Sequence, residues 1–198
     1  MHKKGKIGIY ILRVLLVVLC LLTVAYIFSN SLKTGEASSV QSSGVTDFVK
    51  DCVASVAPES KVANATGSGY RKLHAFVRRM AHFSEFAVLG VLLVCCYFSF
   101  TQKKKWLLVL PVALVGVAFA DETIQGFVVG RVADMADVIM DILGGLTGGM
   151  VALAGILWIL FMLGRAKKKK TADIEDLQIE VVVVKRCDRQ KGECDGER

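Results

Sequence analysis

Four long runs of apolar residues divide the chain, and polar or charged segments separate them. The runs cover residues 7–28, 81–100, 106–125 and 138–163. Each is close to the ~20 residues that an α-helix needs to cross the hydrocarbon core of a bilayer. The first run carries a single charge, Arg13, close enough to its cytoplasmic end for the guanidinium to reach the membrane interface. The pattern predicts an all-α membrane protein with four transmembrane helices.

The first run follows a short basic segment, as the hydrophobic region of a secretory signal peptide does. It is too long for such a region, and no A-x-A cleavage site follows it. We therefore interpret residues 7–28 as a membrane anchor that stays in the protein.

Basic residues cluster outside the apolar runs, at residues 2–6, 103–105 and 165–170. Because cytoplasmic segments of membrane proteins carry an excess of Lys and Arg, these clusters predict that both termini are cytoplasmic, and an even number of spans agrees. Residues 29–70 would then face outward. Within them, apolar and polar positions of residues 45–57 alternate at helical spacing, which is typical of an interfacial helix.

The expected domain organisation is simple. Residues 1–165 form the membrane domain, and residues 166–198 form a charged cytoplasmic tail. The tail contains one short β-prone run, at residues 179–184, which is too small to be a domain.

Composition adds little to this picture. The 198 residues are 54% apolar and 22% charged, with a net charge of +7. Most of the basic excess lies in the clusters that set the topology, so it does not indicate nucleic-acid binding. We expect a multi-pass protein of the cytoplasmic membrane whose surroundings are the lipid bilayer.

Ionisable residues lie inside or at the edges of the last three apolar runs. Such groups cost about 2.5–3.5 kcal/mol each at the centre of a bilayer and usually mark a function. Arg78, His82 and Glu85 are four and three residues apart, which places them on one face of a helix. Asp121 lies about 22 Å along the third run, and Gln125 follows one turn later.

With cytoplasmic termini, these groups and the acids that begin the fourth run reach the same depth near the outer face. We therefore predict one polar binding pocket in the outer leaflet. Simpler structural roles remain open for single members: an interfacial charge for Arg79, a satisfied buried group for His82, and a helix N-terminal acid for Asp137. The predicted pocket residues are Arg78, Arg79, His82, Glu85, Asp121, Glu122, Gln125, Arg131, Asp137 and Asp141.

Glycines recur every four positions in the fourth run. Gly144 and Gly148 form one such pair, and Gly145 and Gly149 form another. Small residues at this spacing allow two helix backbones to approach closely, so we interpret them as a packing face, through which a dimer could also form. A phosphate-binding loop is disfavoured because the glycines lie in the middle of a span.

Three motifs resemble those of the VanZ-like family of bacterial membrane proteins, whose pattern is close to R-K-x-A-H-F-x-E-Y, D-E-x-H-Q-x-F-x-P-G-R and D-V-x-x-D-x-x-G. The likeness covers about residues 5–165 and includes the sequence FSNS at residues 28–31. Phe86, Ile124 and Val129 replace the family's Tyr, His and Pro, and the change at 124 argues against a two-histidine metal site. The corresponding segments here are RMAHFSEF (79–86), DETIQGFVVGR (121–131) and DVIMDILG (137–144).

The resemblance implies a role in the cell envelope, because the member that names the family raises resistance to the glycopeptide antibiotic teicoplanin. Our leading hypothesis is a non-enzymatic or unclassified envelope protein that needs no cofactor. Its pocket would bind the headgroup of a lipid-linked cell-wall precursor or of a phospholipid, with Arg78, Arg79 and Arg131 holding phosphate or carboxylate oxygens.

Two alternatives belong to other functional classes. The first is a membrane-embedded enzyme acting on a lipid-linked substrate. In it, His82 and two of the acids Glu85, Asp121, Glu122, Asp137 and Asp141 either bind a divalent metal or act as acid and base. The set His82, Glu85, Asp121 and Glu122 would suit zinc or manganese. The second is a proton-coupled transporter. Proton-relay chains usually continue across the membrane, and the cytoplasmic halves of the last three runs are apolar, which argues against transport.

Overall fold

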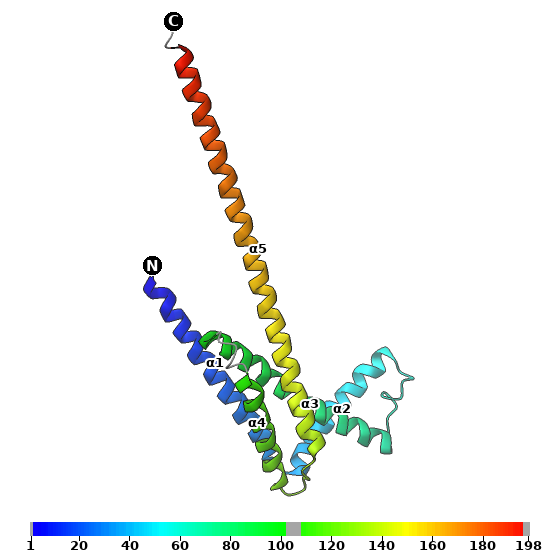
Figure 1. The fold of residues 1–198 in the computed structure, drawn as a ribbon. Coiled ribbons are helices and arrows are strands. Elements are labelled where there is room, and N and C mark those ends of the chain that lie inside the picture. The colour runs from blue at the N-terminus through cyan, green and yellow to red at the C-terminus, as the bar shows by residue number, and fades with distance from the viewer. Residues whose placement is uncertain (1, 102–107, 196–198) are drawn as a thin grey trace. The chain divides into compact units, whose positions relative to one another are not determined.

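The structure, a computed structural model, describes the backbone of residues 2–101 and 108–195 and the side chains of residues 7–101 and 108–168. These ranges contain helices and no strands, which confirms the predicted all-α fold (Figure 1). The helices are α1 (His2–Ser31), α2 (Gly35–Val56), α3 (Gly67–Phe100), α4 (Val109–Gly126) and α5 (Met135–Asp195).

Four described helical segments are long and apolar enough to cross a membrane, as the sequence predicts. They are Ile7–Ser31, Gly67–Phe100, Val109–Gly126 and Met135–Lys168. The predicted basic cluster at 103–105 and the predicted start of the third span at 106 lie outside the described residues.

Helix α3 begins 14 residues before the apolar run that predicts it, at Gly67 instead of residue 81. Hydropathy marks the part of a helix that lipid surrounds, whereas a helix continues until its backbone is capped or broken. Residues 67–80 contain no proline, so the charged turns before the apolar run stay helical. Arg78 and Arg79 are therefore well inside α3, not at its start.

Helix α2 is longer than the predicted interfacial helix and starts at Gly35 instead of residue 45. The side chain of Thr34 caps it by accepting a hydrogen bond from the Ala37 amide at 3.3 Å. Serine and glycine are weak helix formers, but α2 packs against α3, and its Thr46 is buried. Tertiary packing therefore stabilises turns that local propensity does not favour.

The core holds the four spanning helices together. It consists of Ile27 from α1, Phe86 and Leu89 from α3, Leu114 and Ala118 from α4, and Val138 from α5. Around it, most apolar side chains face outward. In the most apolar stretch of α1 only 6% of the residues are buried inside the chain, so most of its side chains keep surface available to lipid.

Helix α1 packs against both α3 and α4 (Figure 1). Near the ends of this contact, the Arg13 Nε donates a hydrogen bond to the Ser99 carbonyl oxygen at 2.8 Å. The guanidinium also lies over the Phe100 ring, 5.1 Å from its centroid. The charge of Arg13 is therefore partly stabilised by contacts with the end of α3.

The glycines of α5 lie where its backbone touches α3. A Cβ added at Gly144 would be 2.3 Å from the Phe83 carbonyl oxygen, and one at Gly148 would be 1.9 Å from that of Ala87. On the adjacent face, a Cβ at Gly145 would be 2.3 Å from Leu114. This glycine face is thus occupied by α3 and α4 of the same chain.

The chain divides into two compact units, Met1–Leu153 and Ala154–Arg198. Within the described residues, the second unit is the C-terminal part of α5, up to Asp195. Its run at 179–184, which the sequence marks as β-prone, is helical instead. A single short strand has no hydrogen-bonding partner, so the backbone here is satisfied within the helix.

Candidate functional site

A buried polar cluster lies where the C-terminal ends of α1 and α4 meet the first turns of α5 and the middle of α3. At its centre Asp121 is fully buried. Its Oδ1 accepts a hydrogen bond from Ser31 Oγ at 2.6 Å, and its Oδ2 accepts one from Gln125 Nε2 at 2.8 Å. These bonds orient the carboxylate between α1 and α4.

His82 and Asp141 face this carboxylate from α3 and α5. The His82 Nδ1 is 4.0 Å from Asp121 Oδ2 and has no hydrogen-bond partner among the described residues. Asp141 is 1% exposed, and neither of its carboxylate oxygens has a hydrogen-bond partner there. One nitrogen or oxygen atom of each of the three side chains lies within 4.8 Å of the others.

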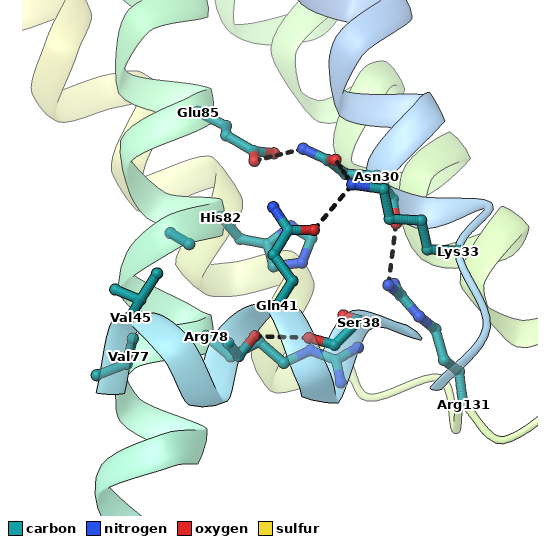
Figure 2. Close-up of a pocket in the computed structure, with 12 residues that line it drawn as sticks. Asn30, Lys33, Ser38, Gln41, Val45, Val77, Arg78, His82, Glu85 and Arg131 are labelled. Atoms are coloured by element: carbon teal, nitrogen blue, oxygen red, sulfur yellow. Dashed lines mark hydrogen bonds between the residues drawn. The ribbon is translucent and has the colours of Figure 1, made fainter. Parts of the chain in front are cut away.

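Glu85, one turn beyond His82 on α3, belongs to a second network. Its Oε1 accepts a hydrogen bond from Asn30 Nδ2 at 2.8 Å, and Lys33 Nζ donates to Asn30 Oδ1 at the same distance. Lys33 also donates to Gln41 Oε1 on α2 at 2.8 Å. Figure 2 shows this chain of contacts, which joins α1, α2 and α3.

Glu122 and Arg79 interact with the chain around the start of α5. The backbone amide of Asp134 donates a hydrogen bond to Glu122 Oε1. Arg79 forms ion pairs with Asp137 at 2.9 Å and Asp134 at 3.3 Å, and its side chain is 46% exposed. Exposed pairs contribute about 0–1 kcal/mol, so Arg79 is a paired group at the rim of the cluster.

Arg131 comes from the loop between α4 and α5 and is only partly satisfied. One terminal nitrogen, Nη2, donates to the Asn30 carbonyl oxygen at 3.0 Å, whereas Nε and Nη1 are buried without a partner among the described residues. Burial lowers the pKa of the Arg131 guanidinium, and the nearby charge of Arg78 lowers it further. An arginine pKa is high enough that the group stays charged.

A close contact with the start of α2 holds the loop that carries Arg131. The Gly35 amide donates to the Val129 carbonyl oxygen at 3.1 Å. A Cβ at Gly35 would lie 2.1 Å from the Gly130 oxygen, and Gly130 has a φ of 78°, which favours glycine. Both glycines are needed for the loop to approach α2 this closely.

Two cavities lie beside the cluster and share Arg78, His82 and Arg131 on their walls. We call the larger one, of about 360 Å³, the loop cavity, because the α4–α5 loop lines it together with Asp141 and Gln125. The smaller one, of about 90 Å³, is the α2 cavity of Figure 2, which Glu85 and Lys33 also line.

A third depression, the α1–α3 groove, is mainly apolar and has a volume of about 340 Å³. Glu85 lines both this groove and the α2 cavity, so the two spaces share one side chain. The groove is lined by Leu19, Leu22, Thr23, Tyr26, Ser84, Glu85 and Val88.

The structure divides the predicted pocket residues among separate sets of contacts. Among the predicted acids, Asp141 lies with His82 and Asp121, whereas Glu85 and Glu122 make other contacts. Sequence reasoning also missed four polar residues that complete the networks. Asn30 and Ser31 could have been found from their place at the end of the first span. Lys33 and Gln41 follow only from the packing of α2. The missed residues are Asn30, Ser31, Lys33 and Gln41.

Four membrane-crossing helices around a buried polar cluster define the chain as a multi-pass helical membrane protein. Residues 15–162 match the model of the VanZ/LLP1 family, and the chain therefore belongs to that family. This confirms the resemblance of the three motifs. No curated protein and no solved structure matches the chain.

Proposed function

We propose that the protein binds the anionic headgroup of a membrane lipid, either a phospholipid or a lipid-linked cell-wall precursor, and thereby influences susceptibility to glycopeptides such as teicoplanin. It does so in the cytoplasmic membrane, and the binding residues line the loop cavity and the α2 cavity. Catalysis is not required for this role.

The observation that carries the proposal is the unsatisfied guanidinium of Arg131. A buried donor without a partner costs about 1–3 kcal/mol, and two such nitrogens belong to Arg131, a residue that lines both cavities. Phosphate and carboxylate oxygens fit the planar donor pattern of arginine. Arg78 lines the same wall and adds a second positive charge.

The α1–α3 groove supports a ligand that carries a hydrocarbon chain. Its walls are mainly leucine, valine and tyrosine side chains, and Glu85 lines both the groove and the α2 cavity. A lipid could place its chain in this groove while its headgroup reaches Arg131. An anionic solute without a chain would have no use for the groove.

The Arg131→Gln variant tests the binding role, and Arg79→Gln is its matched control. Hydrogen bonds to charged groups contribute about 1.5–3 kcal/mol, so Arg131→Gln is expected to weaken binding of an anionic lipid by at least about tenfold. Arg79 also lines the loop cavity, but its guanidinium is already paired with Asp134 and Asp137, so its replacement is expected to have a much smaller effect.

Binding is measured on the full chain in nanodiscs, with phosphatidylglycerol in one arm and a polyprenyl diphosphate in the other. The stronger of the two identifies the ligand source. Teicoplanin susceptibility is scored in parallel in strains with equal protein levels. Equal binding by wild type and Arg131→Gln, with an unchanged drug response, contradicts the proposal.

We also propose that the polar cluster faces outward and that both termini are cytoplasmic, in agreement with the basic clusters. Cys52 on α2 provides the test because its side chain is exposed. A membrane-impermeant maleimide applied to intact cells is expected to label the protein, and Cys52→Ser is expected to abolish the labelling. Labelling that persists in Cys52→Ser and disappears in Cys187→Ser/Cys194→Ser would show the opposite topology.

A further inference from the structure

Three side chains of the polar cluster are arranged as ligands around a common point. His82 from α3, Asp121 from α4 and Asp141 from α5 each offer one atom, and these atoms lie within 4.8 Å of one another. They come from three different helices and are 39 and 20 residues apart in sequence. Their proximity is therefore a product of the packing of the three helices and not of a local turn.

Asp141 supplies the strongest sign that something is bound here. The side chain is almost completely buried, and both oxygens lack a hydrogen-bond partner among the described residues. No ion pair to Asp141 is present among those residues either. A buried carboxylate without compensation is strongly unfavourable, so Asp141 needs either a proton or a cation as its partner.

The nearby arginines make no hydrogen bond or ion pair with Asp141 among the described residues. Arg79 pairs with Asp134 and Asp137 at the rim. Arg131 donates to the Asn30 carbonyl oxygen and lines the loop cavity, as Asp141 does, without a hydrogen bond between them. A cation between the three ligands would compensate both Asp141 and the unpartnered His82 Nδ1.

The surroundings of Asp121 resemble the outer shell of a metal site. Ser31 Oγ and Gln125 Nε2 donate to its two oxygens at 2.6 and 2.8 Å. Hydrogen bonds of this kind orient a ligating carboxylate and hold it in place before the metal binds. Each carboxylate oxygen keeps lone pairs for a second partner, so these bonds do not block ligation.

We infer that His82, Asp121 and Asp141 form a binding site for one divalent cation. One imidazole nitrogen and two carboxylates suit Zn²⁺ or Mn²⁺ better than the all-oxygen ions Mg²⁺ and Ca²⁺. The ligand set leaves coordination positions for water or for a ligand oxygen, since three protein ligands do not complete a tetrahedral or octahedral shell. The inference concerns cation binding only and does not depend on the lipid-binding proposal.

The test uses the purified full chain, stripped with a chelator and titrated with Zn²⁺ and, separately, with Mn²⁺. Elemental analysis measures stoichiometry, and electron paramagnetic resonance follows Mn²⁺ binding. Wild type is expected to bind about one ion per chain and to melt at a higher temperature with the ion than without it. Asp141→Asn and His82→Gln are each expected to weaken binding by at least about tenfold.

Glu122→Gln is the matched control. It removes one carboxylate from the same cluster but leaves the three proposed ligands in place, and its amide oxygen can still accept from Asp134. Its affinity is expected to stay close to that of wild type. The inference is overturned if wild type binds neither ion stoichiometrically, if both ligand variants bind as well as wild type, or if Glu122→Gln weakens binding as much as they do. Lipid binding tested with Arg131→Gln fails or succeeds separately.

Discussion

The Gly148→Val variant is expected to lose about 3 kcal/mol of unfolding free energy, at the upper end of typical overpacking costs. A Cβ at this position would lie 1.9 Å from the Ala87 carbonyl oxygen and 2.6 Å from its carbonyl carbon. Because backbone atoms of a helix cannot rotate away as a side chain can, α3 and α5 must separate. That movement would also draw Asp141 away from His82.

Thermal unfolding in detergent, followed by circular dichroism, measures the effect. Gly155→Val is the control, since it makes the same change on the same helix at a glycine with nothing within 4 Å of the added Cβ. We expect the control to stay within about 0.5 kcal/mol of wild type. Equal melting temperatures for the two variants would show that α3 and α5 are not in backbone contact.

The Phe86→Ala variant is expected to cost about 3–5 kcal/mol, the range for deleting a buried aromatic ring. Phe86 is 0% exposed and packs in the core with residues of α1, α4 and α5. It follows Glu85 directly and lies one turn from His82, so the ring supports the polar cluster from the apolar side. Loss of the ring is expected to loosen the helices that bring His82, Asp121 and Asp141 together.

Phe76→Ala provides the comparison for this variant. Phe76 lies on the same helix, but it is 58% exposed, so its removal leaves no internal cavity. The measurement is the loss of melting temperature in each variant together with the yield of folded protein. A loss in Phe76→Ala as large as in Phe86→Ala would show that the core is not centred on Phe86.

Much of the fold could be predicted because the bilayer imposes a simple length requirement on apolar runs. The spans at 7–28 and 138–163 are both contained within described helices. Helix ends were less predictable. Residues 67–80 and 35–44 are polar and give no hydropathy signal, yet they are helical because capping by Thr34 and packing of α2 on α3 stabilise them.

The candidate site divides in the same way. Arg78, His82 and Glu85 line one cavity, and their helical spacing is visible in the sequence. Arg79 pairs with Asp134 and Asp137, so its charge is already balanced within the chain. The spacing of residues in the sequence does not predict this pairing. Which arginine keeps free donors depends on how the loop meets α2.

The sequence by itself determined the number of spans, the polar residues at membrane depth and the glycine face of α5, because length, hydropathy and helical period are local properties. Only the tertiary structure decided which groups are neighbours. Asp141 lies beside His82 and Asp121, whereas Glu85 accepts a hydrogen bond from Asn30. These contacts depend on the rotation and depth of each helix relative to the others. Backbone contacts between helices, such as Gly148 against Ala87, set this rotation and depth. The sequence of one helix alone does not determine such contacts.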